Sequence, residues 1–145
     1  MAVSALLYGQ VFVSAFNKEI DFNSDAIKVM LCTSTYSPNQ DTHQYKSSVT
    51  NEVTGTGYTA GGATLANCTI TYTGASNTLK LDADDVSWAA STITARYAVI
   101  YDSTPASDAT RPLIALIDFG ADMSSTSGAF TITFDANGIA TVTVS

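Results

Sequence analysis

The sequence feature that most constrains the fold is a series of short apolar runs bounded by glycine, asparagine, aspartate and serine. The longest run, TITARYAVIYD from Thr92 to Asp102, alternates along its length and predicts a β-strand. The residues expected on one face of this strand are Ile93, Ala95, Tyr97, Val99 and Tyr101. Core strands are expected near residues 26–32, 63–72, 93–102, 112–119, 129–134 and 139–144.

Two local patterns predict hairpins. Residues 63–72 (ATLANCTITY) alternate with a phase slip near Asn67, which indicates a bulge, and residues 77–81 (NTLKL) follow a turn and are expected to pair back. The sequence DANG, from Asp135 to Gly138, separates the last two runs and predicts a hairpin between them.

These patterns predict an all-β, single-domain antiparallel β-sandwich, either jelly-roll-like or immunoglobulin-like. The chain has 145 residues, the usual size of one domain. Charged residues make up only 13%, and threonine, valine and tyrosine are frequent, a composition that favours strands. We expect the sandwich to span residues 21–145.

Residues 1–20 are apolar and are expected to form an N-terminal arm or a short helix. Tyr8, Phe12 and Phe16 recur at helical spacing, although the intervening valines also fit a strand. We expect these three aromatic residues to contact neighbouring subunits, and deletion of residues 1–12 to leave the core folded. No basic region or small-residue cleavage pattern marks a signal peptide, so the chain is expected to fold where it is made.

Residues 34–62 are rich in turn formers and predict a long surface loop. Its glycines are expected to allow sharp turns or close packing against backbone. Tyrosine is enriched at interfaces, so Tyr36, Tyr45 and Tyr58 are predicted contact residues. Replacing Tyr45 and Tyr58 with alanine is accordingly expected to spare the core.

No catalytic, metal or cofactor site is expected. The single histidine, His43, lies in a polar segment without a nucleophile motif and is interpreted as a surface residue. Asp82, Asp84 and Asp85 are close in sequence, but their spacing matches no EF-hand, and they are interpreted as turn residues.

Charge, hydropathy and cysteine spacing argue against nucleic-acid-binding, membrane-spanning and metal or redox proteins. A net charge of -7 argues against nucleic-acid binding, and no apolar run reaches the roughly 20 residues needed to span a membrane. Cys32 and Cys68 lack metal or redox spacing and are expected to be free thiols.

Two further residues have a predicted environment. Trp88 is expected in the core, and Arg96 is expected either in solvent or paired with an aspartate.

The run IKVMLCTSTYSPNQDTHQYKSSVTNEVTGTGYTAGGATL, followed by KLDADDVSW, STITARYAVIYD, PLIALIDFG and FTITFDANGI, resembles a family of small virion proteins of tailed bacteriophages and prophages. The resemblance covers most of the chain, from about Ile20 to the end. Its motifs identify the family without fixing a position in the virion, and they carry no catalytic residues.

The resemblance implies a capsid decoration, or cement, protein that binds the outer surface of the shell and stabilises it. The implied partners are the major capsid protein and further copies of this chain in a trimer. The implied location is the capsid surface, after synthesis in the host cytoplasm. A tail-associated structural protein or a receptor-binding or glycan-binding protein remains the alternative, and an enzyme is the weakest option.

Overall fold

The elements of the fold are mostly strands, as the alternation predicted. The computed structural model describes residues 2–145, so Met1, where the expected arm begins, lies outside the described residues. The strands are β1 (Ser4–Leu7), β2 (Ile27–Cys32), β3 (Ala63–Thr64), β4 (Thr69–Thr73), β5 (Thr78–Asp82), β6 (Val86–Asp102), β7 (Leu113–Ile132) and β8 (Ala140–Thr143). The helices are α1 (Val11–Phe16) and the short 3-10 helix η1 (Lys46–Ser48).

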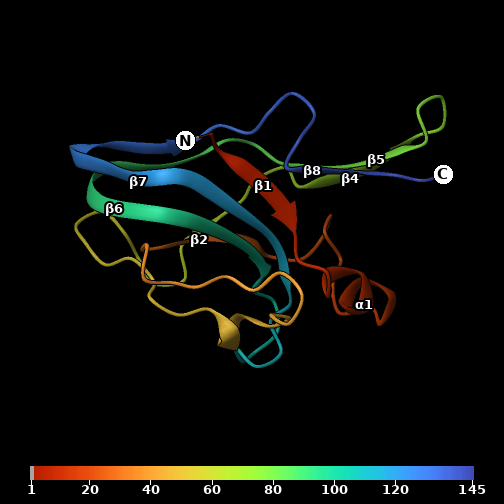
Figure 1. Ribbon diagram of the computed structural model, residues 1–145, viewed down its shortest axis with the longest axis horizontal. Coiled ribbons are helices and arrows are strands. Elements are labelled where there is room, and N and C mark those ends of the chain that lie inside the picture. The colour runs from red at the N-terminus through yellow and green to blue at the C-terminus, as the bar shows by residue number, and fades with distance from the viewer. Residues whose placement is uncertain (1) are drawn as a thin grey trace.

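The strands form two antiparallel sheets, which confirms the predicted all-β, sandwich-like class. The larger sheet has the order β1-β7-β6-β2-β3, and the smaller has the order β4-β5-β8. Figure 1 shows the small sheet extending from one end of the large one, with α1 beside it. The N-terminal segment is therefore a sheet strand followed by a helix, and a deletion of residues 1–12 would remove part of the large sheet.

The central hairpin, β6 with β7, curls over at its far end (Figure 1). The rings of Phe119 and Phe130, both on β7, have centroids 5.9 Å apart. A straight strand would separate these two residues by roughly 35 Å. The register between β6 and β7 shifts between Trp88 and Ser91 and again between Ala95 and Tyr97, and such bulges bend a strand pair.

The bulge after Ala95 overturns the predicted face of β6. The alternation of β6 reverses at this register shift, so Ile93 and Ala95 share a core cluster with Ala98 and Ile100, while Tyr97 packs against the other cluster. Val99 and Tyr101 follow Tyr97. At the bulge, Arg96 pairs with Asp118 through an Nε–Oδ1 distance of 2.7 Å, one of the two arrangements expected for it.

The expected break between residues 112–119 and 129–134 is also absent, because β7 continues through the polar segment between them. Ser124 and Ser125 pair with Thr94 and Ile93 of β6. The hydroxyls of Thr94 and Ser124 lie 2.7 Å apart and form a hydrogen bond across the pair. Small hydroxyl residues thus maintain the pairing of β6 with β7 where the hairpin bends, although residues of this kind are typical of turns.

The chain passes from one sheet to the other at two points where the sequence predicted continuity. One point lies within a single predicted strand, and the other lies within a predicted hairpin. Residues 63–72 divide between β3 and β4, and Asn67, with φ of 52°, lies where the chain leaves the large sheet. The hairpin of β4 with β5 is confirmed. The predicted pairing of residues 129–134 with 139–144 is wrong: a tight turn forms as the Gly138 N–H donates to Asp135, but β8 then pairs with β5.

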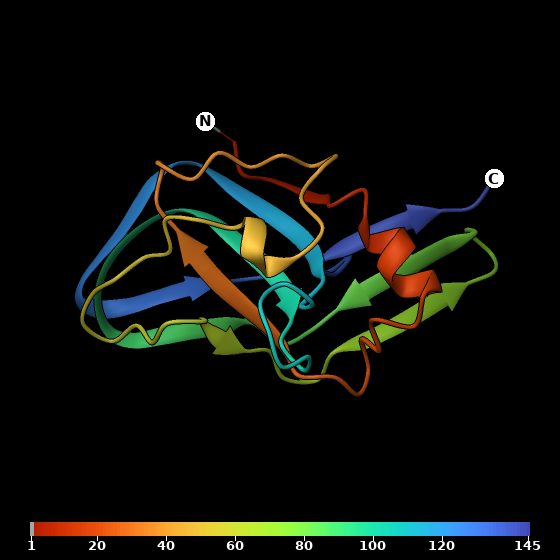
Figure 2. The ribbon, with the colours of Figure 1, turned by 90° about the horizontal axis from the view of Figure 1, so that it is seen from below.

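Residues 33–62 cover one face of the large sheet. The ring of Tyr36 is buried in a cluster with Tyr8, Met30 and Tyr101. Isolated bridges join this segment to the rest of the chain, pairing Cys32 with Glu52, Tyr45 with Pro112 and Thr56 with Thr92. The segment predicted as a surface loop therefore forms a covering layer of the core, and Figure 2 shows it passing over β2 and β6.

Both cysteines are free, as predicted, and we expect them to react at different rates in the folded protein. Burial raises the pKa of the Cys32 thiol to about 12, and it also raises the pKa of the half-buried Cys68. Because the thiolate is the reactive form, Cys68 should react with a maleimide and Cys32 should be protected. In denaturant without reductant, two thiols per chain should be found, and fewer would indicate a disulfide. A Cys68→Ser variant, which should retain the slow thiol alone, is the control.

Candidate partner-binding surface

The helix α1 exposes its apolar side chains to solvent. Of its six residues, Val11 and Ser14 are buried, whereas Phe12, Val13 and Phe16 are 44%, 47% and 88% exposed. The buried Ser14 hydroxyl accepts a hydrogen bond from the Gln44 side-chain amide at 3.2 Å. A surface helix normally turns its apolar stripe to the core, so this reversed arrangement indicates a surface that a partner covers.

The small sheet is amphipathic and presents its apolar face on the same side. Register pairs Ile70 with Leu81 and Tyr72 with Leu79, and the intervening positions are mostly threonine. Val142 of β8 extends the apolar face beside Leu79. Ile70 and Tyr72 remain exposed, so the helix covers this face incompletely.

A groove of about 790 Å³ lies between α1 and this face, and we call it the α1 groove. Figure 2 shows the helix lying against the small sheet. The apolar walls come from helix residues such as Phe12 and from Leu79, Leu81 and Val142. The charged lining residues are Lys18 and Asp21. The groove is thus a nearly uncharged surface on a chain with a net charge of -7.

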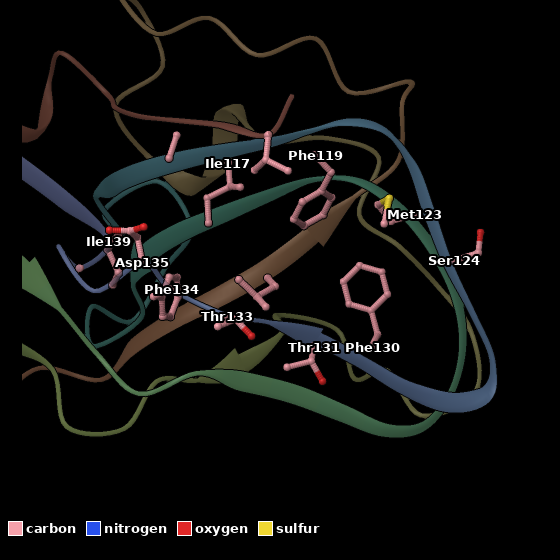
Figure 3. Close-up of a pocket in the computed structure, with 14 residues that line it drawn as sticks. Ile117, Phe119, Met123, Ser124, Phe130, Thr131, Thr133, Phe134, Asp135 and Ile139 are labelled. Atoms are coloured by element: carbon pink, nitrogen blue, oxygen red, sulfur yellow. The ribbon is translucent and has the colours of Figure 1, made fainter. Parts of the chain in front are cut away.

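A second hollow of about 540 Å³, the β7 recess, lies under the curl of β7 (Figure 3). The rings of Phe119 and Phe130 point toward each other across it, and Phe134 lies along its wall. Val3 and Met123 are exposed at its lining. Side chains from β1 and from both halves of β7 therefore meet around an apolar space.

The β7 recess continues along the outer edge of β1. A hollow of about 480 Å³ there is lined by residues of β1 and by the chain from Asp135 to Thr141. Because β1 is an end strand of its sheet, part of its outer edge is open to pairing with another chain, while the Leu7 carbonyl accepts a hydrogen bond from the Gln40 side-chain amide at 2.9 Å.

Four predicted contact residues lie elsewhere than expected or already have partners within the chain. Tyr8 is 0% and Tyr36 2% exposed, so the prediction of both as surface contacts is corrected. The Tyr8 and Tyr36 hydroxyls are 3.1 Å apart, and the Tyr36 hydroxyl is 3.0 Å from Nδ1 of His43. Burial raises the pKa of both tyrosines and lowers the pKa of His43.

The other two loop tyrosines are half-buried. The Tyr58 hydroxyl accepts a hydrogen bond from the Leu31 N–H at 3.0 Å and donates one to Glu52 at 2.7 Å. The Tyr45 hydroxyl donates to Glu19. Burial raises the pKa of both phenols. These tyrosines anchor the covering segment, and of the predicted contact residues only Phe12 and Phe16 belong to an exposed apolar surface.

Sequence reasoning missed Val13, Ile70, Tyr72 and Met123 as exposed apolar residues. The alternation TITYT did place Ile70 and Tyr72 on one face of a strand. Nothing local in the sequence indicates that this face is left half-covered, because that depends on where α1 packs.

The acidic turn before β6 has local structural roles. Asp82 pairs with Lys80, Asp84 accepts a hydrogen bond from Asn67, and Asp85 accepts one from the Phe134 N–H. Within residues 2–145, no group of three or more His, Cys, Asp or Glu side chains is arranged to hold a metal ion. In the same part of the chain, no helix has the length and apolar character needed to cross a membrane.

One carboxyl group has an unusual environment. Asp102, at the end of β6, is fully buried, and burial together with neighbouring Asp25 raises its pKa to about 6. Its Oδ1 accepts a hydrogen bond from the Thr104 N–H at 2.8 Å, which fixes the turn after the strand.

Comparison of the chain with protein-family models, with curated proteins and with solved structures found no match.

Proposed function

We propose that this chain is a structural protein of a tailed-bacteriophage virion, which binds the outer surface of the capsid and stabilises it. The observation that carries the proposal is the exposed apolar hollow of the β7 recess beside the edge strand β1. Contiguous exposed apolar surface marks interaction sites on proteins that function in assemblies. The sequence resemblance supplies the class of assembly, with the major capsid protein and further copies of the chain as partners.

The distribution of charge supports a position away from the packaged genome. Lys46, Lys80, Arg96 and Arg111 each form an ion pair with an aspartate within residues 2–145. Nucleic-acid binding needs unpaired cations clustered on one face, so most of the positive charge here is already used.

The β7 recess is the surface that we assign to the shell. It combines an apolar hollow with the outer edge of β1, and an extended segment can add to such an edge while inserting alternate side chains into the hollow. The expected occupant is an extended segment of the major capsid protein with apolar residues at alternate positions.

The glycan-binding alternative receives less support from the structure. It required exposed aromatic rings on the long loop, but Tyr36 is buried, and Tyr45 and Tyr58 are half-buried and hydrogen-bonded. A tail location uses the same kind of apolar surface and is distinguished by the experiment below.

We expect a Met123→Glu variant to bind the capsid at least about tenfold more weakly than the parent chain, because it places a charge at the β7 recess. The gene for this chain would be deleted from the encoding phage, and the purified chain would then be added to the virions that this phage produces. Occupancy and position would be measured by electron cryomicroscopy, and genome release on heating would report stabilisation. Thr126→Glu, an exposed change on the same strand, is the matched control.

Density confined to the tail would contradict capsid decoration. Equal occupancy of the Met123→Glu and Thr126→Glu variants would contradict the assignment of the β7 recess.

A further inference from the structure

We propose that a second copy of the chain covers the α1 groove, with Phe16 of each copy inserted into the groove of the other in a two-fold contact. The inference deepens the proposed function, on which it rests for the expectation that copies of the chain assemble.

The face contains both a projection and a hollow. Phe16, at the end of α1, is 88% exposed, and the α1 groove lies beside it against Leu79 and Val142 of the small sheet. A two-fold interface brings the same surface together from both copies, so it requires a surface complementary to itself. A projecting ring next to an apolar hollow meets this requirement.

The exposed apolar area is sufficient for such a contact. The exposed apolar residues of α1, of the apolar face of the small sheet and of its C-terminal extension are Phe12, Val13, Phe16, Ile70, Tyr72 and Val144. At about 200 Å² for a fully exposed aromatic residue and somewhat less for an aliphatic one, their exposed fractions amount to roughly 600 Å². This is at the upper end for a patch on a monomer, and two copies together reach about 1,200 Å², the lower limit of a specific interface.

The charges of the face are also complementary to themselves. Lys18 and Asp21 are the charged residues lining the groove, both are exposed, and neither belongs to an ion pair within the described chain, residues 2–145. A two-fold contact can place Lys18 of each copy near Asp21 of the other. Elsewhere the chain has an excess of acidic residues, so two copies approach with least repulsion through this face.

Because the projection and the hollow lie on one face, the geometry points to a pair of chains in place of the trimer implied by the sequence resemblance. A ring of three would need two different complementary faces.

The test is the mass of the purified full chain in solution, measured by sedimentation or light scattering across micromolar concentrations. We expect twice the 15.2 kDa of one chain. Phe16→Glu should raise the dissociation constant on the order of 100-fold and give monomers, as loss of a central interface residue does. Thr71→Glu is the matched control, because Thr71 is exposed on the opposite face of the same sheet.

A charge exchange tests the orientation of the pair. Lys18→Asp should weaken the dimer, and the double variant Lys18→Asp with Asp21→Lys should restore it. Circular dichroism would establish that each variant is folded.

A monomeric or trimeric parent, or a Phe16→Glu variant with the mass of the parent, would overturn the two-fold contact. Such a result leaves capsid decoration to be decided by occupancy on virions. Conversely, a dimer that binds no virion would contradict the proposed function alone.

Discussion

Replacing Tyr58 with alanine is expected to lower the free energy of unfolding by about 3–5 kcal/mol. The ring lies 6.0 Å, centroid to centroid, from that of the buried Trp88, and the hydroxyl accepts the hydrogen bond of the Leu31 N–H. Truncation would leave a cavity beside Trp88 and an unpaired N–H on the inner strand β2. Urea denaturation followed by tryptophan fluorescence would measure the change.

Tyr45→Ala is the matched control for this substitution, because Tyr45 belongs to the same covering segment and its hydroxyl bonds to the side chain of Glu19. A loss of about 1 kcal/mol or less is expected there. The sequence predicted that both tyrosines are dispensable for the core, and the structure changes that expectation for Tyr58. Equal and small losses for the two variants would show that the covering segment is not part of the cooperative core.

Gly62→Ala is expected to destabilise the fold by at least about 3 kcal/mol. Gly62 has φ of 78°, in the left-handed region, and an added Cβ would meet the carbonyl of Val29 and lie 2.7 Å from Cα of Met30. These contacts are with backbone of β2, which cannot move without disturbing its pairing with β6, the central strand of the large sheet. The expected fall in melting temperature is about 10 °C, measured by calorimetry or circular dichroism.

Gly74→Ala is the control, since an added Cβ there would meet no atom within 4 Å. It should leave stability within about 1 kcal/mol of the parent chain. If both variants melt alike, the close approach of Gly62 to β2 is not a determinant of stability.

The strands that the sequence predicted correctly are those defined by local pattern. β2 is a short apolar run between turns, and the hairpin of β4 with β5 follows from alternation on both sides of a turn. The partition of strands between two sheets depends on pairing between distant residues. The sequence DANG does form its tight turn, yet β8 pairs with β5 because the curl of β7 directs the chain to the other sheet.

A single bulge limited the prediction of the core. The alternation of TITARYAVIYD is regular in the sequence, and the register shift with β7 between Ala95 and Tyr97 reverses it without altering any composition signal. The candidate site shows a similar limit: helical spacing grouped Tyr8 with Phe12 and Phe16, but the helix begins at Val11 and Tyr8 packs into the core. Exposure of the last two aromatic residues depends on tertiary packing, which local spacing does not specify.

The pairing of β1 with β7 has a consequence for synthesis of the chain. Ser4 pairs with Asp118, so β1 is synthesised about 110 residues before its partner in β7. At typical rates of translation this interval lasts roughly 5–20 s. During that time both β1 and the apolar α1 lack the surfaces that later hold them, and exposed strand edges of this kind are prone to aggregate. We therefore expect the nascent chain to be most prone to aggregation while the segment before β7 is being translated.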